Sequence, residues 1–229
     1  GLYATFMPKP FADKTGNGLH MHLSLWSADA DQPLFETDND PRGLGLSQLA
    51  YQFIGGVLDQ AEALTAILCP TVNSYKRIGV GPPASGATWA PAYAVYGGNN
   101  RTQMIRVPAE GRFELRVADG SANPYLSLAA LLGAGLDGVA RALDPGEPNV
   151  DNLYALSLED VTARGIVTLP PTLLHATDHL EADSVLRTAL GTGRDGDYVD
   201  YFAQTKRDEF RTVTDQVTAA ELETYLSLV

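Results

Sequence analysis

Two segments of this sequence alternate between apolar and polar side chains, and this pattern constrains the fold more than any other feature. Residues 19–26 place leucine and methionine on one side, and polar residues including His20 and His22 on the other. Residues 112–117 alternate in the same way between charged and apolar side chains. Because successive side chains of a strand point to opposite faces, each segment is predicted to be a half-buried β-strand with one polar face.

The remaining pattern predicts an α+β fold in which a mostly antiparallel sheet packs with helices. Residues 1–143 are expected to hold the sheet and the active site, and residues 144–229 to form a helical tail. Further strands are predicted over residues 3–10 and 102–107. Helices are predicted over residues 47–68, 124–143, 158–164, 177–190, 197–214 and 218–228, with Ser47 as an N-cap.

Two glycine-rich stretches are predicted to be turns or loops close to a site. Gly16 and Gly18 come just before the first alternating segment, where glycine permits positive φ and a close approach of the backbone to a ligand. Residues 79–100 contain five glycines, three prolines and no charged residue. Loops of this length without structure of their own are uncommon in compact domains and usually functional.

The overall charge excludes two classes of partner. The formal net charge is −12 and the isoelectric point is about 4.6, so nucleic acid and anionic membrane surfaces would be repelled.

The most apolar uninterrupted run, residues 125–136, is shorter than the roughly 20 residues that cross a bilayer. Cys69 is the single cysteine, which fits a reducing cytoplasm, and it is interpreted as a small core residue.

The polar strand faces allow a structural and a functional interpretation. Arg112, Glu114 and Arg116 could form a ladder of salt bridges; alternatively, Glu114 binds a divalent cation while the arginines hold anionic oxygens. His20 and His22 could face solvent, or one could bind a metal while the other contacts a phosphate. Cations at Arg77, Arg101 and Arg106 favour an anionic ligand in this acidic chain.

Taken together, an ordered series of motifs resembles the C-terminal catalytic portion of the glutamine synthetase family. The match covers about residues 7–140, is looser in the tail, and is similar to the type III-like or γ-glutamylmethylamide synthetase branch. The motifs are Met7-Pro8-Lys9-Pro10 with Gly16–Trp26, Asn73-Ser74-Tyr75-Lys76-Arg77, Asn100-Arg101 to Arg106-Val107-Pro108, Arg112-Phe113-Glu114-Leu115-Arg116, and Ser121–Leu126 with its Asn-Pro-Tyr-Leu start.

The resemblance implies an ATP-dependent ligase that forms a γ-glutamyl amide from L-glutamate and ammonia or a small amine through γ-glutamyl phosphate. It implies ATP and Mg²⁺ or Mn²⁺ as cofactors, a sheet that is part of a glutamine synthetase-type barrel, and a homo-oligomer. The implied residues are His20 and Glu114 for the metal; His22, Ser24, Arg106 and Arg112 for ATP; Gly16, Arg77 and Arg116 for glutamate; and Arg101 with Arg77 for catalysis, Arg101 stabilising the phosphoryl group in transfer.

Two departures from the family pattern matter. Residues 78–108 contain no Asp or Glu, whereas the family has a flap glutamate there that helps deprotonate ammonium. Trp89 offers an aromatic face to an alkylated amine, so an alkylamine such as methylamine is one acceptor; ammonia is the other, with the missing group supplied from elsewhere. The family's other metal ligands lie upstream of residue 1, so this chain alone is expected to be inactive and to expose apolar surface.

Other interpretations stay open at this point. A relative that keeps the nucleotide site without catalysis is one rival, and a guanidino kinase with a related sheet is another. His175 and His179 are spaced for a metal on one helix face, but a solvent-exposed face is preferred. Tyr154 corresponds to a tyrosine that some bacterial relatives modify with a nucleotide, and its poorly matching surroundings favour an ordinary residue.

Overall fold

A four-stranded sheet carries the alternating segments found in the sequence. The computed structural model describes residues 1–78, 90–194 and 196–226. The strands run in the order β1 (Met21–Leu23), β4 (Arg112–Leu115), β3 (Ile105–Ala109) and β2 (Tyr96–Gly97). β4 pairs antiparallel with both of its neighbours, and β2 pairs parallel with β3. The mostly antiparallel sheet is therefore confirmed, and its described strands form an open sheet rather than a closed barrel.

The register of this sheet determines which polar side chains become neighbours. Glu114 on the central strand β4 lies opposite His22 of β1 on one side and opposite Arg106 of β3 on the other. Directly opposed residues on one face of a sheet bring their side chains within contact distance. A glutamate is thus flanked by an imidazole and a guanidinium, and it is only 4% exposed.

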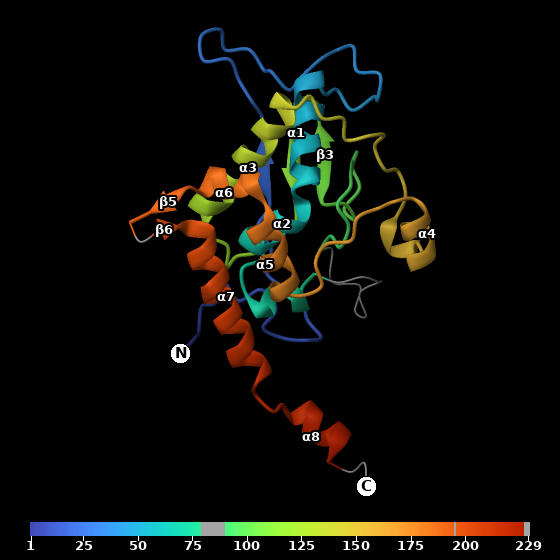
Figure 1. Ribbon diagram of the computed structural model, residues 1–229. Coiled ribbons are helices and arrows are strands. Elements are labelled where there is room, and N and C mark those ends of the chain that lie inside the picture. Colours follow the sequence, from blue (N-terminus) through green and yellow to red (C-terminus); the bar gives the residue numbers. More distant parts are fainter. Residues whose placement is uncertain (79–89, 195, 227–229) are drawn as a thin grey trace.

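Helices make up most of the rest of the described chain. α1 and α3 lie side by side next to the sheet, and the chain ends beyond α8, which extends away from the rest of the structure (Figure 1). The helices are α1 (Gln48–Asp59), α2 (Ala61–Leu68), α3 (Pro124–Ala140), α4 (Leu158–Ala163), α5 (Leu173–Ala182), α6 (Ser184–Leu190), α7 (Tyr198–Thr214) and α8 (Ala219–Tyr225), with two 3₁₀ turns, η1 (Val72–Lys76) and η2 (Leu153–Ala155), and a hairpin of β5 (Thr192–Gly193) and β6 (Gly196–Asp197).

The apolar face of the sheet packs on α1. Phe113 of β4 is fully buried, and its ring lies 5.8 Å from that of Phe53 on α1 and 5.9 Å from that of Phe35. Aromatic rings at this separation combine area burial with favourable edge and offset contacts. This packing holds the apolar side of β4 inward, so its charged side faces away from the core.

Two predicted helices are each divided by one residue. The helix expected over residues 47–68 begins at its predicted cap, Ser47, but is divided at Gln60, whose φ of −99° and ψ of 10° leave the helical region. The helix expected over 177–190 begins earlier, as α5, and is divided at Asp183, whose side chain accepts from the Leu186 N–H at 2.8 Å. Apolar residues continue in helical spacing across both breaks, so periodicity does not reveal them.

The strand predicted over residues 3–10 is wrong, because those residues join no sheet. Pro8 and Pro10 lack the N–H groups that a ladder needs. The side chain of Asn73 satisfies the backbone groups of Lys9 that a neighbouring strand would otherwise bind. It accepts from Lys9 N–H at 2.7 Å and donates to Lys9 C=O at 3.0 Å. The segment is thus fixed to η1 by a single side chain.

The loop before α1 is organised around the carboxylate of Asp40. It accepts hydrogen bonds from the N–H groups of Arg42 at 2.9 Å, Leu44 at 2.7 Å and Leu46 at 3.1 Å, and from the hydroxyl of Tyr51 at 2.7 Å. Burial alone would raise the pKa of Asp40, but these hydrogen bonds outweigh it and hold the pKa below its ordinary value. The ionised carboxylate therefore stabilises the folded loop.

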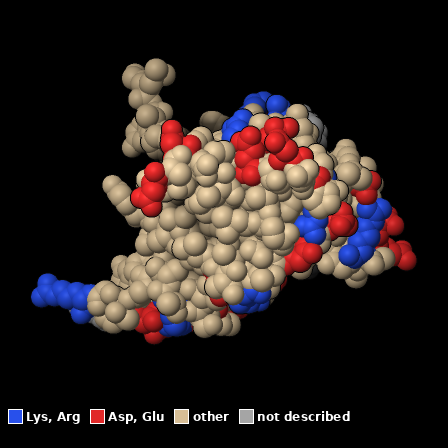
Figure 2. Space-filling view, turned by 90° about the horizontal axis from the view of Figure 1, so that it is seen from above, with Lys and Arg blue, Asp and Glu red and all other residues tan. Residues whose placement is uncertain are grey.

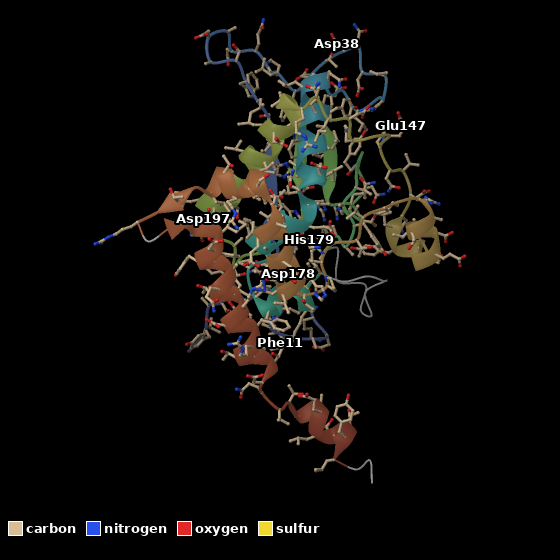
Figure 3. The ribbon with its side chains drawn as sticks, viewed as in Figure 1. Phe11, Asp38, Glu147, Asp178, His179 and Asp197 are labelled. Atoms are coloured by element: carbon tan, nitrogen blue, oxygen red, sulfur yellow. The ribbon has the colours of Figure 1, made fainter. Side chains whose placement is uncertain are left out.

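Replacing Asp40 with alanine is expected to lower the free energy of unfolding at pH 7 by about 2–3 kcal/mol, because several backbone donors lose a charged acceptor. Since folding lowers the pKa, the stabilisation is complete above the unfolded value of about 3.9 and is lost as the pH falls through the folded pKa. Urea unfolding at pH 7 and at pH 3 checks this. The difference in free energy of unfolding between wild type and Asp40→Ala should be smaller at pH 3 than at pH 7. The control is Asp38→Ala, at an exposed residue labelled in Figure 3, and its free energy of unfolding should equal that of wild type at both pH values.

The surface combines small charged groups with exposed apolar residues. In Figure 2, acidic and basic side chains lie in small groups, several of them containing both signs, around a face whose centre holds other residue types. One face of α3 exposes Tyr125, Leu128, Leu132 and Leu136 at helical spacing. No helix in the described part of the chain is long and apolar enough to cross a lipid bilayer.

Candidate active site

A cavity of about 330 Å³ opens on the polar face of the sheet. It collects residues from four separate parts of the chain: the glycine-rich turn with the residues up to His20, the end of η1, residues 90–106, and β4 with the residue after it. The lining residues are Thr15, Gly16, Gly18, His20, Arg77, Ala90, Arg101, Arg106, Glu114 and Arg116. Four arginines and one histidine thus face a single carboxylate, so the cavity is suited to anionic ligands.

The carboxylate of Glu114 lies at the centre of this arrangement. Its Oε1 atom is 2.8 Å from His20 Nδ1 and 3.8 Å from His22 Nε2. Its Oε2 atom accepts from the guanidinium groups of Arg106 at 2.9 Å and Arg116 at 3.1 Å. One oxygen therefore accepts from arginines and the other faces imidazoles. Of the predicted ladder of Arg112, Glu114 and Arg116, the Glu114–Arg116 salt bridge is present, but Arg106 of β3 is the second arginine of Glu114 and Arg112 lies beside His22.

The electrostatics of the cavity favour an ionised Glu114 and a neutral His20. Burial would raise the pKa of Glu114, but hydrogen bonds from Arg106 and Arg116 hold that pKa below its usual value. Burial, together with the charge of Arg116, lowers the pKa of His20 and outweighs the opposite effect of Glu114. A carboxylate and a neutral imidazole are the protonation states that bind a metal ion.

The spacing of His20 and Glu114 fits two neighbouring ligands of one divalent ion. Ligands about 2.1 Å from Mg²⁺ at right angles lie about 3 Å apart, close to the 2.8 Å between His20 Nδ1 and Glu114 Oε1. Within the ranges that the structure describes, no group of three or more His, Cys, Asp and Glu side chains is arranged to hold a metal. The pair would therefore supply only part of the ligand set of a divalent ion.

The glycines of the turn at Gly16 are required by close approach rather than by backbone angle. Neither Gly16 nor Gly18 uses the positive φ that glycine permits. A Cβ atom at Gly16 would lie 2.5 Å from the carbonyl oxygen of Pro8, and one at Gly18 would lie 2.8 Å from Arg77 Nη2. A side chain at Gly16 would require a shift of the backbone, and one at Gly18 would require a shift of the Arg77 guanidinium.

Arg77 connects this turn to the strand that carries Glu114. It is only 7% exposed, and its Nη1 donates to the carbonyl of Val117 at 2.7 Å. Its Nη2 donates to the carbonyl of Arg116 at 3.5 Å. Arg77 therefore lines the cavity while its guanidinium is fixed to the backbone that follows β4.

Three predicted residues lie outside the cavity lining: His22 on β1, Ser24 just after β1, and Arg112 on β4. His22 Nδ1 lies 3.0 Å from Arg112 Nη1, and Ser24 accepts from the indole N–H of Trp26 at 3.1 Å. All three are exposed. The polar face of the sheet thus continues from the cavity to an open, solvent-facing end.

Sequence reasoning missed several residues that shape the cavity. Asn99 accepts from Arg106 Nε at 2.9 Å, so that Asn99 and Glu114 fix two edges of the same guanidinium. The region after residue 148 also returns to residues 90–103: Leu169 N–H donates to Ala92 C=O at 2.8 Å and Asn100 Nδ2 donates to Asp151 C=O at 2.7 Å. The only sequence signals that indicated a functional role for residues 90–103 were the Asn100-Arg101 motif and the uncharged stretch of residues 79–100.

Of the remaining sequence interpretations, those of Cys69 and of the two histidines are confirmed, and that of Trp89 lies outside the described residues. Cys69 is fully buried, as predicted, and burial raises the pKa of its thiol. His175 and His179 are exposed on α5, as preferred, with His179 (labelled in Figure 3) 3.3 Å from Glu62 of α2. The interpretation of Trp89 concerns residues 79–89, which lie outside the described ranges.

Comparisons with known proteins agree with this geometry. A family model described as glutamine synthetase, catalytic domain, matches residues 1–225. The chain is 50% identical over 226 residues to a glutamate–methylamine ligase of Methyloversatilis universalis, covering 99% of this chain and 49% of that protein. It is 46% identical over 191 residues to a glutamine synthetase of Rhizobium leguminosarum bv. phaseoli, covering 83% and 43%.

Solved structures show the same similarity. One described as the GmaS/ADP complex, conformation 1, superposes with a TM-score of 0.86 at 48% identity, covering 97% of this chain and 49% of that one. Another, described as apo GmaS without ligand, has a TM-score of 0.79 at 45% identity, covering 97% and 48%. The chain spans about half the length of the relatives it matches.

Proposed function

The chain belongs to the glutamine synthetase family, and on that premise we propose that the full-length protein is an ATP-dependent ligase joining L-glutamate to a small amine. The observation that carries the proposal is the buried Glu114, which faces His20 with one oxygen and two arginines with the other. Transfer of a phosphoryl group depends mainly on positioning and on neutralising charge. The arginine-lined cavity is suited to both.

The metal ion and ATP would bind at two neighbouring parts of the site. His20 and Glu114 would hold Mg²⁺ or Mn²⁺, which when bound neutralises phosphate charge. ATP would lie along the open end of the sheet at His22, Ser24 and Arg112, with Arg106 at the boundary of the cavity. Arg106 suits this position because Asn99 and Glu114 fix its orientation, leaving its Nη2 for a phosphate oxygen.

The substrate roles fall to the cavity itself. Gly16, Arg77 and Arg116 would hold the carboxylates of glutamate, and Arg101 would stabilise the phosphoryl group as it passes to the γ-carboxylate. Arg77 also acts in catalysis by keeping the glycine-rich turn against the strand that carries Glu114. A γ-glutamyl phosphate would then be attacked by the amine, with phosphate as the leaving group.

The acceptor is ammonia or a small alkylamine, and two observations favour the alkylamine. Residues 78–108 hold no carboxylate to attract ammonium. The chain is also 50% identical to a glutamate–methylamine ligase. We also infer a cytoplasmic homo-oligomer, supported by the single buried cysteine and by the exposed apolar face of α3.

A substrate panel on the full-length protein tests the proposal. With ATP, Mg²⁺ and glutamate, phosphate release should depend on an added amine, and kcat/KM for methylamine should exceed that for ammonia by at least about tenfold, a difference of about 1.4 kcal/mol. Arg101→Ala should abolish release, whereas the surface control Arg164→Ala should not. Higher efficiency with ammonia would reject the alkylamine, and nucleotide binding without release would favour a non-catalytic relative.

A further inference from the structure

The region predicted to be a helical tail supplies a side chain that hydrogen-bonds to a residue of the cavity wall. Tyr154 lies in η2, and its hydroxyl donates to the carbonyl oxygen of Ala90 at 2.7 Å. Ala90 is 7% exposed and lines the cavity. This hydrogen bond joins two residues that are 64 positions apart in the sequence.

A second contact fixes the same 3₁₀ turn beside the catalytic arginine. Leu153 is 1% exposed, and its N–H donates to Thr102 Oγ1 at 3.3 Å. Thr102 directly follows Arg101, and its hydroxyl donates to Asn100 Oδ1 at 2.8 Å. η2 therefore contacts the chain both at Ala90 and next to Arg101, two parts of the cavity wall.

The surroundings of the Tyr154 hydroxyl place it close to the charges of the cavity. Burial raises the pKa of Tyr154, while the charges of Arg116 and Arg77 lower it. Both arginines line the cavity. The raised pKa keeps the phenol protonated at neutral pH, so it acts as a donor to Ala90 and not as an acid or base.

We propose that Tyr154 is a positioning residue that holds Ala90 in the wall facing Arg101, and thereby sets the space in which glutamate and the amine meet. The inference rests on the proposed function. Ala90 precedes Pro91, and a residue before proline has a restricted backbone, so the Ala90 carbonyl cannot easily find another partner by rotation. The Tyr154 hydroxyl contacts the cavity wall at Ala90, whereas ATP is proposed to bind at the other end of the sheet, at His22 and Arg112, so ATP binding should be unaffected.

Tyr154→Phe in the full-length enzyme tests this, because it removes one hydroxyl and keeps the ring. The KM values for glutamate and for the amine should rise about threefold to tenfold, as expected for loss of one partly buried hydrogen bond, while the KM for ATP stays within about twofold. Asn152→Ala withdraws the side chain that accepts from the Tyr154 N–H at 3.1 Å. Asn152→Ala should therefore also raise the KM values for glutamate and for the amine.

Tyr198→Phe is the matched control, since Tyr198 is a half-buried phenol in the same tail that does not line the cavity; its kinetics should equal wild type. Thermal unfolding of all variants separates positioning from a general loss of stability. The inference would be overturned if Tyr154→Phe and Asn152→Ala both kept the KM values for glutamate and the amine within twofold of wild type. An equal change in the KM values for glutamate, the amine and ATP would also overturn it. Absence of γ-glutamyl amide formation by the wild-type enzyme would instead reject the proposed function.

Discussion

Replacement of Glu114 with glutamine is expected to lower kcat/KM of the full-length enzyme by about a hundredfold to a thousandfold, the scale seen when a preorganised electrostatic group is removed from a transition-state site. The amide keeps the shape of the side chain but has no charge, so it neither balances Arg106 and Arg116 nor binds a divalent ion strongly. Because Arg116 is 3% exposed, two guanidinium groups and an imidazole would face one another without a counter-charge. Steady-state kinetics with saturating Mg²⁺ measures the loss.

Stability measurements distinguish the loss of catalysis from the loss of folding stability in Glu114→Gln. Breaking a buried ion pair by removing one partner costs about 3–5 kcal/mol, so chemical unfolding should detect a large destabilisation as well. Glu159→Gln, an exposed glutamate in the first turn of α4, is the matched control and should leave both activity and stability unchanged. If Glu114→Gln kept its activity within tenfold of wild type, Glu114 could not be the metal and arginine centre of the site.

Replacement of Gly56 with alanine is expected to destabilise the fold by at least about 3 kcal/mol, at or above the upper end for overpacking of a core. A Cβ atom at Gly56 would lie 2.1 Å from the carbonyl oxygen of Ala134 and 2.7 Å from the Cα of Gly138. Both obstacles are backbone atoms of α3, so no side-chain rotation relieves them. α1 and α3 would have to separate, and α1 carries Phe53, which packs behind β4.

The measurement is urea unfolding of the full-length protein, with Gly98→Ala as the control. At Gly98 the added methyl would meet only Leu44 Cδ2, at an ordinary 3.4 Å. The control should therefore unfold within about 1 kcal/mol of wild type. A Gly56→Ala protein as stable as this control would show that the two helices are not in such close contact.

The sequence determined much of the active site because the relevant residues lie on one strand or on motifs with fixed spacing. Alternation over residues 112–117 predicted that Glu114 and Arg116 share a face, and the same period placed His20 beside His22. The fold class followed from the same reasoning, and the cap at Ser47 is confirmed. These are local properties, since a strand's two-residue period is fixed by the backbone itself.

Only the tertiary structure decided which of these faces meet and what surrounds them. The pairing of β1 and β3 with β4 placed His22 and Arg106 on either side of Glu114. The return of residues 149–169 to residues 90–103, and with it the contact of Tyr154 with Ala90, has no local signature because it joins segments that are distant in the sequence, through one antiparallel bridge, a small apolar cluster and side-chain hydrogen bonds. The breaks at Gln60 and Asp183 were invisible for a related reason: the apolar period is unchanged across them, and packing of whole helices determines the backbone angles there.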